Sequence, residues 1–196
     1  MDEYAMLPNI RRHSIIVARA ALWMVDGFEK SAPAPASLPD RSLVAAGALL
    51  HDIAKTPCLR NGCDHAREGA EICRRLGYPE IASIVGEHVV LKSCDEKLWS
   101  RGVFSATEII YYADKRVRHE EIVSLEDRLE YILEHYGNGD PEMHRLIRRN
   151  FDKCVELEGH LFAFLPFSPV QLAEQVERAL PDELDSYFFE QECKQD

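Results

Sequence analysis

The dipeptide His51-Asp52 lies at the end of an apolar run, residues 42–50, that has the composition of a buried helix. An imidazole beside a carboxylate, with apolar residues behind both, places two metal-binding groups where water is scarce. Such ligands suit iron, manganese, zinc or magnesium, whereas a soft-metal site needs thiolates. The pair is therefore a candidate metal site, and a helix end with an unrelated surface aspartate is the alternative.

Further candidate ligands lie on both sides of this pair. They are His13, His65, His88 and Asp114. Asp114 follows a mostly apolar segment, and a buried carboxylate needs a cation or several hydrogen-bond donors. Taken singly, His13 is typical of a core or cap histidine, His65 of a helix start and His88 of a surface residue. The set as a whole favours a metal centre.

The pattern of apolar residues predicts an all-α protein. Expected helices cover residues 9–26 (Asn9 as N-cap), about 41–52 (capped by Ser37 or Asp40), 65–76 (capped by Asp64), 79–88, 105–118, 125–136 (capped by Ser124), 141–160, 169–180 and 182–192. Prolines make residues 31–37 an exposed connector, and residues 56–62 read as a loop. Residues 89–104 are expected to be irregular, with a helical turn over 95–100. Sustained period-2 alternation is missing, so no sheet is expected.

Length and charge restrict the class of protein. The 196 residues suit one domain, and 46% hydrophobic residues suffice for a core. No apolar stretch approaches the roughly 20 residues that span a bilayer, and the acidic N-terminus lacks a signal-peptide pattern. We therefore expect a cytoplasmic protein without a membrane partner. The net charge of −11 disfavours a nucleic-acid polymer as partner.

Six cysteines are present, and in a chain of this size and location we expect reduced thiols. Cys58 and Cys63 lie close to His65, so a small thiolate metal site is an alternative there. No second cysteine pair has zinc-finger spacing, which argues against that alternative.

At this point the sequence resembles the HD-domain superfamily of metal-dependent phosphohydrolases, an all-α helical bundle. The segments that carry the resemblance are His13–Ala18, Gly47–Lys55 and Tyr112–Lys115, within residues 10–135. The segments His65–Ala70 and Gly86–Val89 are similar to the extra ligand motifs of the dinuclear, YqeK-like branch, which is associated with hydrolysis of dinucleoside polyphosphates. We accordingly divide the chain into an HD domain, residues 1–138, and a C-terminal helical extension on the same domain, residues 139–196.

The resemblance implies two divalent metal ions, with iron or manganese favoured and zinc, magnesium, cobalt or nickel as alternatives. His13, His51, Asp52 and Asp114 hold one ion in this scheme. His65 and His88 hold the second, with Asp52 as a bridge. A metal-activated water then attacks phosphorus, and Asp52 is counted among the catalytic residues.

A cationic side chain beside the ions offsets charge on the phosphoryl oxygens. Lys55, one helical turn beyond His51 if the helix continues, is the first candidate for catalysis and substrate binding, ahead of Arg116 and Arg118. Residues 115–121 depart from the Glu-Pro-x-Arg stretch that often follows the aspartate in YqeK-like proteins. The loop 57–63 is also unusual. The substrate is thus expected to be a small phosphorylated compound, a nucleotide first among them.

Two other functions use a similar scaffold. One is a di-iron HD-domain oxygenase, which ligand identity alone does not separate from a hydrolase. The other is a non-catalytic HD-type signalling module, against which the complete ligand set argues. The C-terminal aromatics Tyr187, Phe188 and Phe189 are expected to pack on the domain or on a second subunit, which makes a homodimer compatible with the sequence.

Overall fold

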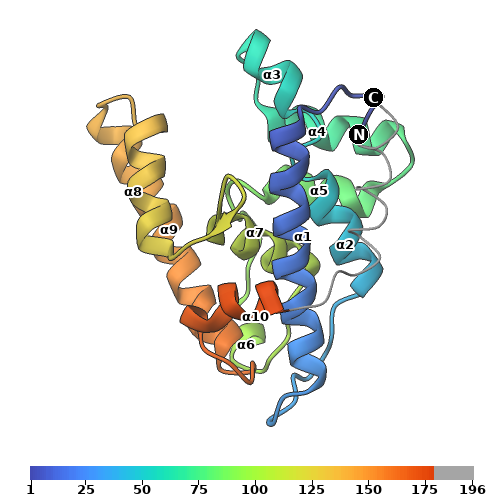
Figure 1. Cartoon of the computed structure of the whole chain (residues 1–196), viewed down its shortest axis with the longest axis vertical. Helices are drawn as coiled ribbons and strands as arrows, with labels where there is room; N and C mark the ends of the chain where they lie inside the picture. Colours follow the sequence, from blue (N-terminus) through green and yellow to red (C-terminus); the bar gives the residue numbers. More distant parts are fainter. Residues whose placement is uncertain (179–196) are drawn as a thin grey trace.

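The computed structural model describes residues 1–178, and they form a helical bundle (Figure 1). The helices are α1 (Pro8–Glu29), α2 (Arg41–Leu50), α3 (Lys55–Asn61), α4 (His65–Arg75), α5 (Pro79–Glu87), α6 (Glu96–Trp99), α7 (Ala106–Arg116), α8 (Leu125–Tyr136), α9 (Pro141–Phe162), the 3₁₀ turn η1 (Pro169–Gln171) and α10 (Leu172–Arg178). The all-α prediction is confirmed. The expected helix over 182–192, the last residues of the helix over 169–180 and the C-terminal aromatics lie outside the described residues.

Helix capping explains where most of these elements begin. The side chain of Asp40 accepts from the backbone N–H of Leu43 at the start of α2, and Asp64 accepts from Ala66 at the start of α4. Such caps satisfy backbone N–H groups that have no partner within the helix. They matter here because α2 ends at His51 and α4 begins at His65.

Three expectations about the elements are wrong. Residues 55–61 form the helix α3, since Pro57 lies in its first turn, where a proline is tolerated, and Gly62 ends it with a φ of 67°. Asn9 does not cap α1, because Pro8 is already the first helical residue and Leu7 is the N-cap. Residues 117–122 form a small antiparallel hairpin of β1 (Val117–Arg118) and β2 (Glu121–Ile122).

The long helix α1 organises the core and packs against α2, α7 and α10. Its buried face includes Ala18, Ala20 and Ala21, all fully buried, and such small side chains allow close approach of neighbouring helices. Residues of α9 and α10 complete the same cluster, among them Phe151, Leu157, Leu161, Leu172 and Val176. A smaller cluster between α4 and α5 lies beside it.

The helix α7 is fixed at its start by a polar arrangement inside the bundle. Ser105 and Glu108 form a reciprocal capping box, and Glu108 also accepts a 2.5 Å hydrogen bond from the fully buried indole of Trp99. The carboxylate thus satisfies the indole N–H and the first turn together. This holds in place the helix that carries Asp114.

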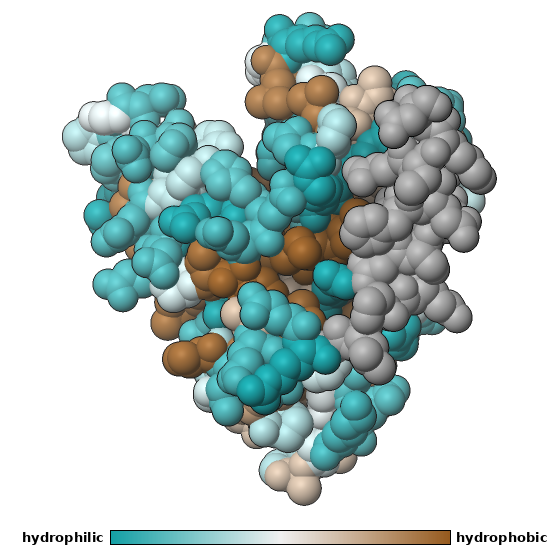
Figure 2. All heavy atoms as spheres, viewed as in Figure 1, coloured by the Kyte–Doolittle hydropathy of each residue, from teal (hydrophilic) through white to brown (hydrophobic). Residues whose placement is uncertain are grey.

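The helix α8 and the start of α9 stand away from α1 in Figure 1. In the space-filling view of Figure 2, a notch separates this pair from the side of α1 and α3. We call this hollow the notch. No helix among residues 1–178 is long and apolar enough to cross a membrane.

The prediction of reduced thiols is wrong for one pair of cysteines. Cys58 in α3 and Cys63 just after it form a disulfide, with their Cα atoms 4.7 Å apart. The left-handed Gly62 turns the chain back so that the two residues meet. Because both sulfur atoms are in this bond, Cys58 and Cys63 offer no thiolate for a metal site. Cys73, Cys94 and Cys154 are free.

Candidate metal centre

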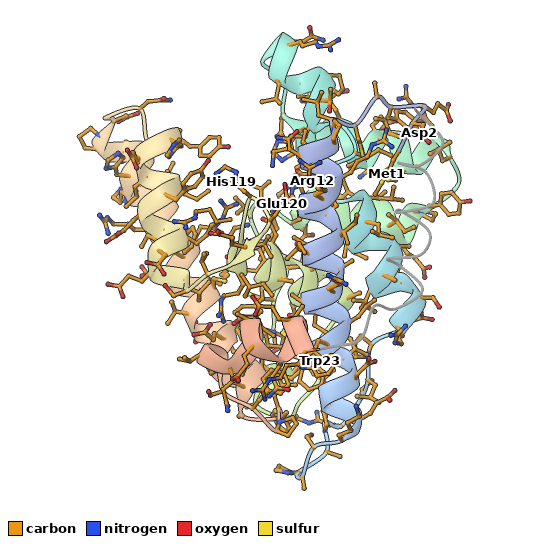
Figure 3. The ribbon with its side chains drawn as sticks, viewed as in Figure 1. Met1, Asp2, Arg12, Trp23, His119 and Glu120 are labelled. Carbon is orange, nitrogen blue, oxygen red and sulfur yellow. A yellow bond between two sulfur atoms is a disulfide. The ribbon has the colours of Figure 1, made fainter. Side chains whose placement is uncertain are left out.

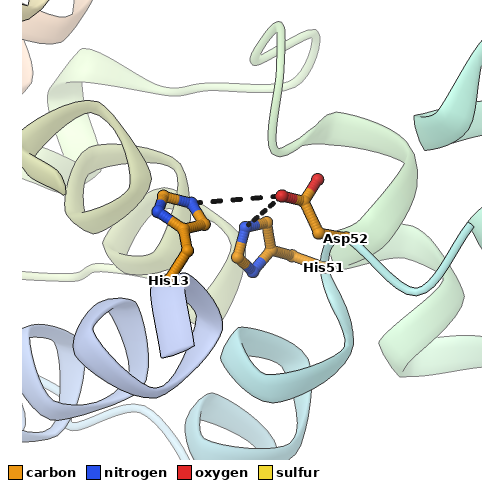
Figure 4. Close-up of side chains that lie close together, drawn as sticks. All are labelled: His13, His51 and Asp52. Carbon is orange, nitrogen blue, oxygen red and sulfur yellow. Dashed lines mark ion pairs between the residues drawn. The ribbon is translucent and has the colours of Figure 1, made fainter. Parts of the chain in front are cut away.

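The structure brings all the candidate ligands together in one cluster. His13 comes from α1, Asp114 from α7 and His65 from the first position of α4. His51 and His88 are the C-cap residues of α2 and α5, and Asp52 lies in the turn that follows α2. Figure 4 shows His13 and His51 directed toward the same carboxylate of Asp52.

One half of the cluster surrounds Asp52 Oδ2 and Asp114 Oδ1. The Nε2 atom of His13 lies 3.1 Å from Asp114 Oδ1 and 4.0 Å from Asp52 Oδ2. The Nε2 atom of His51 lies 3.5 Å from Asp52 Oδ2 and 3.7 Å from Asp114 Oδ1. Adjacent nitrogen or oxygen ligands of one ion are roughly 3–3.5 Å apart, because each lies about 2.0–2.2 Å from it. This spacing suits a single divalent cation.

The other half of the cluster surrounds Asp52 Oδ1. The Nε2 atom of His65 lies 3.3 Å from this oxygen, and that of His88 lies 3.5 Å from it. The two Nε2 atoms are themselves 3.3 Å apart. His13, His51 and Asp52 could thus hold one ion, and Asp52, His65 and His88 another, with one oxygen of Asp52 directed to each group.

Backbone carbonyls fix the orientation of three of the rings. The Nδ1 atoms of His13, His51 and His88 lie 2.9, 2.6 and 2.7 Å from the carbonyl oxygens of His119, Ala48 and Val85. A carbonyl can only accept, so Nδ1 carries the proton and the Nε2 lone pair faces Asp52. Metal-binding histidines show this same arrangement, in which the second ring nitrogen donates to a fixed acceptor.

Two buried atoms at the centre lack a hydrogen-bond partner. They are His51 Nε2 and Asp52 Oδ1, on side chains that are completely or almost completely buried. Leaving such acceptors unsatisfied in the interior is unfavourable, and a cation beside each of them removes the penalty. The residues present therefore fit a divalent metal.

The electrostatics of the cluster follow from burial and close charges. Burial raises the pKa of Asp52, but His51 and Lys55 outweigh it and hold the pKa well below its usual range. For Asp114, Lys115 and His13 likewise overcome the effect of burial and lower the pKa. Both carboxylates are thus ionised at neutral pH, which is the form that binds a cation.

Burial and nearby charges shift the pKa values of His88 and His51 in opposite directions. Burial lowers the pKa of His88 to about 4, so this imidazole is neutral at pH 7. Burial also opposes the charged form of His51, yet Asp52 and Asp114 outweigh it and raise the pKa above the ordinary 6.5. The metal-binding form of His51, with Nε2 unprotonated, is therefore reached at a higher pH than in an ordinary histidine.

Metal affinity should fall as the pH decreases through the raised pKa of His51. Below that pKa each unit of pH should weaken binding of the ion beside His51 by up to about tenfold, since one proton is released when that ion binds. His88 adds no dependence above about pH 5, because its pKa is near 4. Titration calorimetry with Mn²⁺ between pH 6 and 8, in buffers of different ionisation enthalpy, measures both quantities. An affinity that does not change with pH, without proton release, contradicts the expectation.

Two lysines border the cluster. Lys55 Nζ lies 2.7 Å from Asp52 Oδ2, and its side chain remains 29% exposed. Burial lowers the pKa of Lys55, Asp52 and Asp114 raise it above the usual value, and Tyr136 at the end of α8 adds to the rise. Lys55 does not continue the helix of His51, as the sequence suggested; it begins α3 after a turn, and this turn brings it back to Asp52.

Lys115 is a residue that the sequence analysis did not select. Its buried amine donates to Asp114 Oδ2 and to the His88 carbonyl, both at 2.9 Å. It thereby joins α7, which carries Asp114, to the end of α5. The signal available in the sequence was a lysine directly after Asp114 in a segment of mostly buried residues.

Arg116 and Arg118, which the sequence predicted to bind substrate, lie in environments unlike that of Lys55. Arg116 is buried, and its guanidinium donates to the Val123 and Pro169 carbonyls and to Glu158, which does not support a role in substrate binding. A buried guanidinium that donates to several protein acceptors is poorly placed to bind a ligand. Arg118 lies on the hairpin and pairs with Glu121 at 3.2 Å. Neither arginine contacts the candidate ligands.

Comparison with known proteins places this geometry in a family. A tRNA (cytidine(56)-2'-O)-methyltransferase of Picrophilus torridus is 32% identical over 131 residues, which cover 62% of this chain and 35% of that protein. An uncharacterized protein of Methanocaldococcus jannaschii is 28% identical over 120 residues, which cover 57% of this chain and 70% of that protein. The chain thus spans about a third of the methyltransferase.

No solved structure matches the chain. The family model described as "HD domain" matches residues 10–132, which is more than half of the chain and contains every candidate ligand. HD domains bind divalent metals, in agreement with the clusters around Asp52. The chain therefore belongs to the HD-domain family, within the superfamily of metal-dependent phosphohydrolases.

Proposed function

We propose that this protein is a phosphohydrolase that cleaves a nucleotide or another small phosphoester with the help of two divalent metal ions. The observation that carries the proposal is the position of Asp52, whose Oδ2 faces His51 at 3.5 Å while Oδ1 faces His65 at 3.3 Å. A carboxylate with each oxygen directed to a different group of histidines suits a bridge between two cations.

Each ligand has a defined place in this proposal. His13, His51, Asp52 and Asp114 hold one ion, and Asp52, His65 and His88 hold the other. Bound cations of this kind lower the pKa of water and offset charge on phosphoryl oxygens. Lys115 keeps Asp114 in position, so that Oδ1 faces the histidines while the amine occupies Oδ2.

Lys55 is the residue best placed to meet the substrate. It contacts Asp52 and is partly exposed, so its amine can turn from the carboxylate toward a phosphoryl oxygen. A cation there stabilises the negative charge that spreads over these oxygens in the transition state. The same lysine favours a hydrolase, because a phosphoester supplies the anionic group that its amine can contact.

The Lys55→Met variant should lower kcat by about 10²–10³-fold, because one cationic contact to the transition state is lost. Metal content should stay at the wild-type level, since Lys55 is not among the proposed ligands. Steady-state kinetics together with metal analysis check both quantities, and Lys92→Met, at an exposed lysine, is the control. Unchanged kcat in Lys55→Met excludes this role.

The proposed function is tested with a panel of phosphoesters. Protein freed of metal is loaded with manganese, iron, cobalt, nickel, zinc or magnesium and offered dinucleoside tetraphosphates, deoxynucleotides, cyclic dinucleotides and simple phosphate esters. Metal-dependent release of phosphate or nucleoside monophosphate is the expected result. Oxygen consumption by anaerobically purified iron protein, without hydrolysis, identifies an oxygenase instead. Failure to take up any metal identifies a non-catalytic module.

More specific predictions concern the substrate, the location and the assembly of the protein. Hydrolysis of dinucleoside tetraphosphates is the result expected of the YqeK-like branch. The tRNA named for the relative in Picrophilus torridus is not proposed as a substrate, because this chain has a net charge of −11 and spans 35% of that protein. A cytoplasmic location, assembly as a homodimer and a C-terminal extension over 139–196 also stay predictions.

A further inference from the structure

Arg128, on α8, places a cation in a largely buried position. The residue is only 8% exposed, and its Nε atom has no hydrogen-bond partner. Among residues 1–178 the side chain forms no ion pair. The Cζ atom of its guanidinium lies over the ring of Tyr131, 5.5 Å from the ring centroid. Arg116, similarly buried, is surrounded by acceptors. A buried charge is normally paired, and Arg128 has no anionic partner among the described residues.

Aromatic side chains extend along the same face of α8. Arg128, Tyr131 and His135 are spaced three and four residues apart, which places them on one side of the helix. The rings of Tyr131 and His135 stack with centroids 4.0 Å apart, and the His135 side chain is 46% exposed. We call these three residues the α8 stripe.

The α8 stripe lies beside the metal centre. The ring of His119, in the hairpin, meets Tyr131 edge to face at 5.2 Å, while the His119 carbonyl accepts from the metal-centre residue His13. Figure 3 shows His119 and Glu120 between α8 and α1, on the face that Figure 2 shows hollowed by the notch.

The stripe therefore offers a cation and exposed aromatic surface beside His119 of the hairpin. A guanidinium binds phosphate through several parallel hydrogen bonds, and aromatic rings stack on nucleobases whatever the base. A simple phosphate ester has neither a second anionic group nor a base to use them. A nucleoside polyphosphate has both.

We propose that the α8 stripe is a nucleotide subsite, in which Arg128 binds a phosphoryl group other than the one attacked and the ring of His135 contacts the base. This rests on the proposed function and narrows its substrate to nucleotides with more than one phosphoryl group. The scissile phosphoryl group lies at the metal centre beside Lys55. The remainder of the nucleotide extends through the notch toward α8.

The experiment compares Arg128→Met with the wild-type full chain loaded with Mn²⁺. Binding of adenosine 5′-(β,γ-methylene)triphosphate is measured by calorimetry, and hydrolysis of bis(p-nitrophenyl) phosphate is measured in parallel. Nucleotide affinity should fall about 10–100-fold, as expected for loss of a charged hydrogen bond to phosphate. Hydrolysis of the small ester, which does not reach α8, should stay within about twofold.

Thermal unfolding separates a binding role from a structural one. Methionine fills similar space without a charge, so removing an unpaired buried cation should leave Tm unchanged or raise it by about 2–4 °C. Arg101→Met, at an exposed arginine in the turn after α6, removes the same charge elsewhere and should alter neither affinity nor Tm. His135→Ala should weaken binding of the nucleotide but not of inorganic tripolyphosphate.

Two results overturn the proposal. One is wild-type nucleotide affinity in Arg128→Met, and the other is a lower Tm together with equal losses on both substrates, which indicates a structural arginine. Failure of the proposed function is distinct from both. In that case no metal supports hydrolysis of any ester, while the calorimetric comparison of the two proteins still decides whether Arg128 binds the nucleotide.

Discussion

Replacing Asp52 by alanine should abolish metal binding and reduce kcat/KM for any phosphoester by at least about 10³-fold. The reason is that both oxygens of this carboxylate face candidate ligands, His51 on one side and His65 and His88 on the other. Removing it withdraws a ligand from both metals at once, whereas loss of any histidine affects one. Metal analysis by mass spectrometry and steady-state kinetics measure the two effects.

The matched control for this substitution is Asp152→Ala, which removes one carboxylate from the exposed side of α9. It should keep the wild-type metal content and activity. The circular dichroism of Asp52→Ala should show the wild-type helix content, because the bundle is held by its apolar core. Retention of two metal equivalents by Asp52→Ala contradicts the assignment of Asp52 as the bridge.

The second large effect concerns stability rather than catalysis. Arg116→Met should lower the free energy of unfolding by about 3–5 kcal/mol, the usual cost of removing one partner from a buried charge network. The guanidinium holds Glu158 of α9 at 3.1 Å and the Pro169 carbonyl at 2.9 Å, and it also contacts the hydroxyl of Tyr112. Without it, the Val123 and Pro169 carbonyls lose this donor, while Glu158 keeps the hydrogen bond from the hydroxyl of Tyr112. Urea denaturation measures the difference.

This substitution also tests the sequence-based prediction that Arg116 binds substrate. If the arginine has only the structural role seen here, KM should stay at the wild-type value at a temperature where the variant is folded. Arg118→Met is the comparison, since Arg118 is 36% exposed and its pair with Glu121 is worth at most about 1 kcal/mol. Equal stability of the two variants is the result that rules out the network argument.

The positions of the ligands could be anticipated because local sequence determines them. Asp40 and Asp64 are strong N-caps that fix where α2 and α4 begin, and the apolar run 42–50 ends just before His51. His51, Asp52 and His65 lie at those helix ends. Recognition of such ends needs only a few neighbouring residues, so the sequence was informative there.

Other features depend on contacts between distant segments. Arg116 and Lys115 are adjacent in α7, yet one meets α9 and η1 while the other meets the end of α5. The local sequence does not distinguish these two sets of contacts, because both residues are basic and near a helix end. The helix α3 was missed for a different reason. Pro57 and Gly62 can bracket a short helix as well as a loop, and packing decides between them.

The proposed ligands come from α1, from α4, from α7 and from the ends of α2 and α5, so an unfolded chain contains no comparable site. Ligand binding to the folded state alone shifts the unfolding equilibrium by mass action, by about 2.7 kcal/mol at 100 times Kd and 4.1 kcal/mol at 1,000 times Kd. Melting temperatures measured with each metal in turn therefore rank the affinities of the metals, and the measurement needs no substrate. Chelator should lower the melting temperature of the isolated protein by the corresponding amount.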